Sequence, residues 1–124
     1  MLVEDDTDVA FLIEAGLRRE GHRVTTFVDP RPALRFLAEH SDAPRPDVIL
    51  TDLNMPHMDG IELLERAFDI LGGPRPAAVL SGYATASAIK RAEERGIAIA
   101  HKPLPPAELH ALVLQLGSGL PSSR

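Results

Sequence analysis

Charged and hydroxyl side chains follow the apolar runs of this 124-residue chain. Glu4 and Asp5 come directly after the first run, and Asp52 comes soon after the third. Ser81 directly follows the fourth run, and Lys102 follows the fifth. A carboxylate at the end of a buried strand is shielded from water on one side and exposed on the other, which suits a nucleophile or a metal ligand. Side chains of opposite charge after separate apolar runs predict a single charged pocket.

The residue types in this pocket indicate phosphoryl transfer. Three neighbouring carboxylates need cations to compensate their charge. Oxygen ligands without cysteine or histidine favour a hard ion, Mg²⁺ or else Mn²⁺. Lys102 supplies a point charge suited to a phosphoryl oxygen, and Ser81 supplies a hydroxyl donor. Together these groups predict phosphorylation of Asp52.

The elements that must position these residues alternate along the chain. Five short apolar runs predict strands at 2–3, 24–28, 48–50, 77–80 and 97–100. Helical spacing of apolar residues predicts helices around 9–17, 31–39, 61–71, 85–95 and 109–116. This order predicts an α/β fold of five (βα) units, with a parallel sheet and helices on both faces. In such sheets ligands bind beyond the carboxyl ends of the strands, where the polar residues lie.

Glycines and prolines agree with these boundaries. Gly21 and Gly96 are placed as left-handed helix ends, and 72–74 (Gly-Gly-Pro) closes the third helix. Pro106 suits the first turn of the last helix. Gly16 is a misfit that costs about 1 kcal/mol relative to alanine, unless a neighbouring strand must approach closely.

Four motifs then resemble the receiver domain of bacterial two-component response regulators, the chemotaxis regulators among them. They are Leu-Val-Glu-Asp-Asp at 2–6, Thr-Asp-Leu-Asn-Met-Pro-His-Met-Asp-Gly at 51–60, Leu-Ser-Gly at 80–82 and His-Lys-Pro at 101–103. The resemblance covers residues 1–116 and leaves 117–124 as a flexible tail or linker. It implies a doubly wound, flavodoxin-like fold with strand order 2-1-3-4-5.

The resemblance also implies roles for the acidic residues. Asp52 would accept a phosphoryl group from the phosphohistidine of a sensor histidine kinase or a phosphotransfer protein. Asp5 would bind Mg²⁺ directly, Glu4 would act through water, and the backbone carbonyl of Asn54 would be a further ligand beside Asp52. Such a protein is a conformational switch that controls an output, and not a turnover enzyme.

The remaining implied roles concern the switch. Ser81 would be the switch hydroxyl and Lys102 the phosphate-contacting lysine, with its bond to Pro103 in the cis form. Receivers commonly place an aromatic residue three positions before this lysine, but here that position is Ile99. The response is therefore expected to run through Ser81 and the following loop, in which Tyr83 would shield the acyl phosphate and change its environment.

Two alternatives compete with this interpretation. An aspartate-nucleophile phosphatase of the haloacid dehalogenase type needs a general acid two residues after the nucleophile, where this chain has Asn54. A degenerate receiver that serves only as an adaptor or dimerisation module would not need the complete set of acids, Ser81 and Lys102. Ile99 favours an unusual output.

Composition limits the partners. The net charge of −5 and the absence of a basic run argue against nucleic acid as a direct partner. The absence of cysteine excludes disulfides and thiolate metal sites. With no apolar stretch of roughly 20 residues and no signal peptide, the expected location is the cytoplasm, away from membranes. Only three residues precede Glu4, which suggests a truncated first strand.

The identity of the output domain or target is not predicted by the sequence. The surface formed by 85–95, 97–100 and 109–116 is a candidate homodimer interface.

Overall fold

The computed structural model describes residues 1–40, 42 and 44–118, and these residues form one five-stranded parallel sheet with helices around it. The strands are β1 (Leu2–Val3), β2 (Thr26–Phe27), β3 (Ile49–Asp52), β4 (Ala77–Ser81) and β5 (Ala98–His101). The helices are α1 (Thr7–Arg19), α2 (Pro30–Glu39), α3 (Gly60–Leu71), α4 (Ala86–Glu94) and α5 (Pro106–Gly117). The strand order is β2-β1-β3-β4-β5. The predicted α/β class, parallel pairing and strand order are all confirmed.

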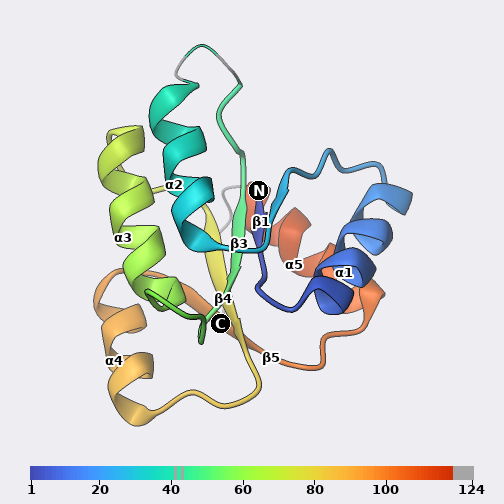
Figure 1. The fold of residues 1–124 in the computed structure, drawn as a ribbon. Coiled ribbons are helices and arrows are strands. Elements are labelled where there is room, and N and C mark those ends of the chain that lie inside the picture. The colour runs from blue at the N-terminus through green and yellow to red at the C-terminus, as the bar shows by residue number, and fades with distance from the viewer. Residues whose placement is uncertain (41, 43, 119–124) are drawn as a thin grey trace.

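Helices cover both faces of this sheet (Figure 1). α1 and α5 pack together on one face, and α2, α3 and α4 lie on the other. The core under α1 and α5 contains Leu2, Leu17, Leu50, Ala78 and Leu109. The core on the opposite face includes Leu37 of α2, Leu64 of α3 and Ala92 of α4. The central strands are thus buried from both sides, as their apolar sequences require.

Two strands differ from the predicted bounds by two residues or more at one end, for reasons of pairing, and β4 and β5 differ by a single residue at an end. The edge strand β2 has two residues instead of five, because its neighbour β1 contributes only Leu2 and Val3 to the ladder. β3 continues two residues past the predicted end, because pairing with β4 extends as far as Asp52 and Leu80. The pairing therefore places Asp52 inside the sheet, and the turn begins after it.

The helix ends follow the predicted signals. Gly21, Gly72 and Gly96 have positive φ angles of 91°, 84° and 68° at the ends of α1, α3 and α4. Pro106 lies in the first turn of α5. This helix runs to Gly117, one residue into the predicted tail, and residues 119–124 of that tail lie outside the described residues. Within the described chain, no helix has the length and apolar character needed to cross a membrane.

Two helix glycines lie against neighbouring segments. A Cβ added at Gly60 would lie 2.2 Å from the backbone carbonyl oxygen of Asp52, so the first turn of α3 contacts the end of β3 directly. A Cβ added at Gly16 would lie 3.7 Å from Cβ of Pro106, which is an ordinary contact. The neighbour of Gly16 is therefore helix α5 and not the strand that the sequence suggested.

Candidate functional site

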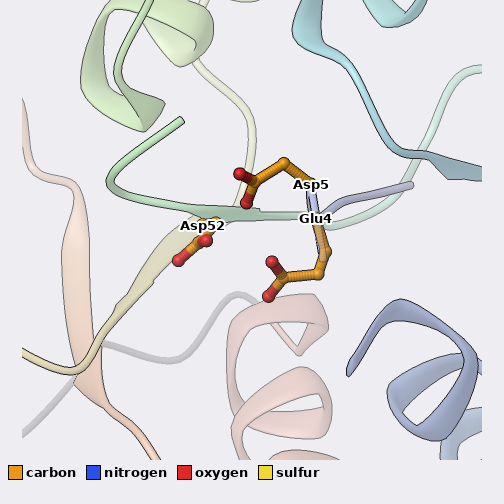
Figure 2. A group of neighbouring side chains, drawn as sticks. All are labelled: Glu4, Asp5 and Asp52. Atoms are coloured by element: carbon orange, nitrogen blue, oxygen red, sulfur yellow. The ribbon is translucent and has the colours of Figure 1, made fainter. Parts of the chain in front are cut away.

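Three carboxylates meet where β1 and β3 end. Glu4 and Asp5 follow β1, and Asp52 is the last residue of β3, two strands that pair in parallel with Val3 opposite Thr51. Each of the three offers an oxygen atom within 4.8 Å of the other two (Figure 2). The three acids therefore form a cluster at the carboxyl edge of the sheet, as the sequence predicted.

Glu4 is the most deeply buried of these acids. Its residue is 1% exposed, and both carboxylate oxygens accept hydrogen bonds. Oε1 accepts from Nζ of Lys102 at 2.8 Å, and Oε2 accepts from the backbone N–H of Asp6 at 3.1 Å. Asp6 itself caps α1, because its side chain accepts the N–H groups of the next turn. Glu4 is thus fixed by partners on both oxygens, whereas Asp5 is exposed.

Lys102 lies between two of the acids. Its Nζ is 2.9 Å from Oδ1 of Asp52 as well as 2.8 Å from Glu4. The backbone N–H of Lys102 donates to the carbonyl of Ser81 at 2.8 Å, and the following bond to Pro103 is cis, as predicted. These contacts direct the ammonium group of Lys102 toward the carboxylates.

The charges in this acidic cluster are not balanced. Burial raises the pKa of Asp52 to about 6, against the hydrogen bond from Lys102 and with a further increase from the charge of Glu4. Burial lowers the pKa of Lys102, but the bonds to Glu4 and Asp52 outweigh it and raise this pKa above its usual value. A single ammonium group contacts two members of this cluster of three carboxylates, so an added cation would be stabilised here.

The donor set fits a magnesium ion. All three side chains offer carboxylate oxygens, and hard divalent cations prefer oxygen ligands. Asp5 is exposed, so part of the coordination shell would remain open to water, which Mg²⁺ characteristically keeps. Asn54 lies two residues past Asp52 in the exposed loop.

Ser81 ends β4, the strand that pairs with β3 as far as Asp52. The residue is 1% exposed, and its hydroxyl donates to the carbonyl of Tyr83 at 2.6 Å and accepts the Tyr83 N–H at 3.0 Å. The Tyr83 residue is 75% exposed, while Ile99 is half-buried against the core. The hydroxyl of Ser81 is therefore engaged by its own loop in this structure.

Comparison with known proteins identifies the family. The family model of the response regulator receiver domain matches residues 1–114. The chain belongs to the response regulator receiver domain family. Its class of function is phosphoryl-accepting signal transduction in two-component systems.

Relatives and solved structures agree with this assignment. The transcriptional regulatory protein PrrA of Mycobacterium tuberculosis is 41% identical over 81 residues, which cover 65% of this chain and 33% of PrrA. An uncharacterized 14.6 kDa protein of Leptolyngbya boryana is 33% identical over 123 residues, covering 93% of this chain and 86% of that protein. The CheY-like receiver domain protein of Methanospirillum hungatei has a TM-score of 0.81 at 25% identity, covering 94% of this chain and 91% of that one. The matched part of this chain thus covers about a third of the length of PrrA.

The receiver domain contains further residues around Asp52 that sequence reasoning did not single out. Asp59 caps α3 by accepting the Glu62 N–H at 2.8 Å, and Gly60 N–H donates to the carbonyl of Leu53 at 2.7 Å. These bonds close the loop after Asp52, in which His57 adopts a positive φ of 78°. An Asp before an amphipathic helix is a capping signal that could have identified Asp59 from sequence. The partner of Asp59 on α4, Arg91, has no such signal.

Proposed function

We propose that Asp52 of this receiver domain accepts a phosphoryl group from the phosphohistidine of a sensor histidine kinase or a phosphotransfer protein. The observation that carries the proposal is the convergence of Asp52, Glu4 and Asp5 with the ammonium group of Lys102. Metal ligands, a phosphate-binding cation and a carboxylate nucleophile are the parts that this reaction requires.

In the proposed step an Asp52 carboxylate oxygen attacks the phosphorus atom. The bond between phosphorus and the donor imidazole breaks, the imidazole leaves with the bonding electron pair, and an acyl phosphate forms on Asp52. Bound Mg²⁺ would neutralise charge on the transferring phosphoryl oxygens. Asp5, Asp52 and the carbonyl of Asn54 would hold this ion, with Glu4 acting through water, and Lys102 would pair with a phosphoryl oxygen.

The proposed switch uses Ser81 because Ile99 offers no aromatic ring. To donate to a phosphoryl oxygen, the hydroxyl of Ser81 must leave the carbonyl of Tyr83, to which it now donates at 2.6 Å. Loss of that bond would free the loop at 82–85. The exposed ring of Tyr83 would then change its environment and report the movement of the loop. Lys102→Ala would impair the switch even where phosphorylation survives, because the phosphoryl group would lose its positively charged partner.

Several features support a switch over the alternatives. Asn54, two residues after Asp52, cannot act as the general acid of a haloacid dehalogenase-type phosphatase, so a turnover enzyme is not proposed. The complete set of acids with Ser81 and Lys102 favours an active receiver over a pure adaptor. The receiver unit would comprise residues 1–116, and its output would lie in a further domain or a target protein. The surface of α4, β5 and α5 is the proposed homodimer interface.

Binding of beryllofluoride, a phosphoryl mimic, separates these functions. An active receiver should bind beryllofluoride only with Mg²⁺ and show amide NMR shifts at residues 82–90 and at Tyr83, with smaller side-chain shifts at Ile99. Asp52→Asn should abolish the response, and Asp5→Asn should abolish most of the Mg²⁺ affinity. No response in the wild-type protein would favour the adaptor, and a large shift confined to Ile99 would contradict the Ser81 mechanism alone.

A further inference from the structure

Helix α4 has only a small apolar contact with the rest of the domain. Its buried residues are Ala88 and Ala92, each with a single side-chain methyl group, and its isoleucine, Ile89, is 39% exposed. The neighbouring α3 buries six residues, among them Ile61 and Leu64. Because the free energy of burial scales with apolar area, packing alone holds α4 less strongly than α3.

Arg91 of α4 and Arg95, the residue that caps its C-terminus, add charged contacts with α3 and with the residue that caps its N-terminus. Nη1 of Arg91 donates to Oδ2 of Asp59 at 2.8 Å, with Nη2 3.5 Å from Oδ1. One helical turn further, Arg95 pairs with Glu65. Burial alone would raise the pKa of Asp59. The hydrogen bonds from Arg91 and from the Glu62 N–H outweigh it and lower this pKa below its usual value.

The ion pair of Arg91 differs from that of Arg95 because its partner, Asp59, lies next to a residue that contacts the proposed phosphoacceptor Asp52. Asp59 immediately precedes Gly60, and a Cβ at Gly60 would meet the carbonyl oxygen of Asp52 at 2.2 Å. At the other end, α4 begins just after the loop whose backbone binds the Ser81 hydroxyl. Asp59, at the end of the loop that follows Asp52, is thus joined by Arg91 to the helix that follows the Ser81 loop.

We propose that Arg91 is a positioning residue whose ion pair with Asp59 holds α4 in its resting place and opposes the switch. The inference rests on the proposed function, in which the 82–85 loop must move when Ser81 leaves Tyr83. A contact made in the resting arrangement and lost in the active one shifts the equilibrium toward rest. Removing it makes the active arrangement easier to reach, so ligands that select that arrangement bind more tightly.

The test compares Arg91→Gln with Arg66→Gln in apparent beryllofluoride affinity at fixed Mg²⁺, followed by amide NMR. Arg66 is a matched control because it is also an arginine and its ion pair, with Glu62, joins two residues of α3. Arg91→Gln should bind about two- to fivefold more tightly, the range for a partly exposed pair, and Arg66→Gln should match the wild type. Asp59→Asn keeps an oxygen for the α3 cap and should reproduce the gain. Combining it with Arg91→Gln should add nothing.

A second readout separates this role from general loosening of the domain. The Mg²⁺ affinity measured without beryllofluoride should be the same in Arg91→Gln and wild type, because Arg91 pairs with Asp59 and not with the three acids of the candidate metal site. Unchanged or weaker beryllofluoride binding by Arg91→Gln, with normal wild-type binding, would overturn this inference and leave the proposed function standing. Absence of beryllofluoride binding by the wild type would overturn both.

Discussion

The carboxylate of Asp52 lies in surroundings that disfavour its charge. Its side chain is 13% exposed and shares the ammonium group of Lys102 with the fully buried Glu4. Burial and the charge of Glu4 raise its pKa to about 6, so the folded domain binds a proton here that the unfolded chain releases near pH 4. The contribution of this carboxyl to stability is therefore complete below about pH 4 and is lost as pH rises through about 6.

Replacing Asp52 should stabilise the metal-free domain. Asp52→Asn removes the carboxylate and should raise the free energy of unfolding at pH 7 by about 1–3 kcal/mol, with the loss of the Lys102 pair favouring the lower end. The gain should shrink toward zero near pH 4. Urea denaturation at both pH values measures it, with the exposed Asp69→Asn as control. A variant no more stable than wild type at pH 7, or a gain that persists at pH 4, would contradict the proposed electrostatics.

Removing the lysine should strengthen metal binding. Nζ of Lys102 compensates the carboxylates of Glu4 and Asp52 that an added cation would also compensate. Lys102→Ala should therefore lower the Kd for Mg²⁺ several-fold, as measured by calorimetric titration of the unphosphorylated domain. Lys90→Ala, which removes an exposed lysine from α4, should leave the Kd unchanged. Weaker Mg²⁺ binding in Lys102→Ala would show that the ammonium group supports the metal site instead of competing with it.

At the scale of elements, local sequence patterns predicted which helices and strands form, but not the features that depend on pairing between distant segments. The apolar runs and helix signals predicted all five strands and all five helices in order. Burial of a strand on both faces and the periodicity of a helix each produce a recognisable pattern of apolar residues. The short β2 could not be predicted, since its length depends on how many residues β1 offers as partners. The hydrogen bond between His22 and His110, at 2.9 Å, was equally hidden because the histidines are 88 residues apart.

The two helix glycines should respond to alanine in opposite directions. Gly16→Ala gains helix propensity and meets only an ordinary contact at Pro106, so it should stabilise the domain by up to about 1 kcal/mol. Gly60→Ala places a methyl group too close to the Asp52 carbonyl and should destabilise the domain by about 2 kcal/mol or more. Urea denaturation of each variant gives the two values. The geometry at the start of α3 would be wrong if Gly60→Ala were as stable as the wild type.

At the scale of the whole molecule, the site follows from topology. Parallel strands bring their carboxyl ends to one edge of the sheet, so Glu4, Asp52 and Lys102 could be predicted to meet although they are distant in sequence. The cis bond at Pro103 and the strand order were predicted through the family resemblance. The link between Arg91 and Asp59 could not be, because it depends on the distance between two helices that no local pattern specifies.

Phosphorylation of Asp52 is the central claim, and intact-mass spectrometry tests it most directly. The wild-type domain and Asp52→Asn would each be incubated with acetyl phosphate, with Mg²⁺ and with a chelator in its place. The wild type should gain a single phosphoryl group only when Mg²⁺ is present, and Asp52→Asn should gain none in either condition. Equal labelling of Asp52→Asn and wild type, or full labelling of the wild type without a divalent metal, would contradict the account.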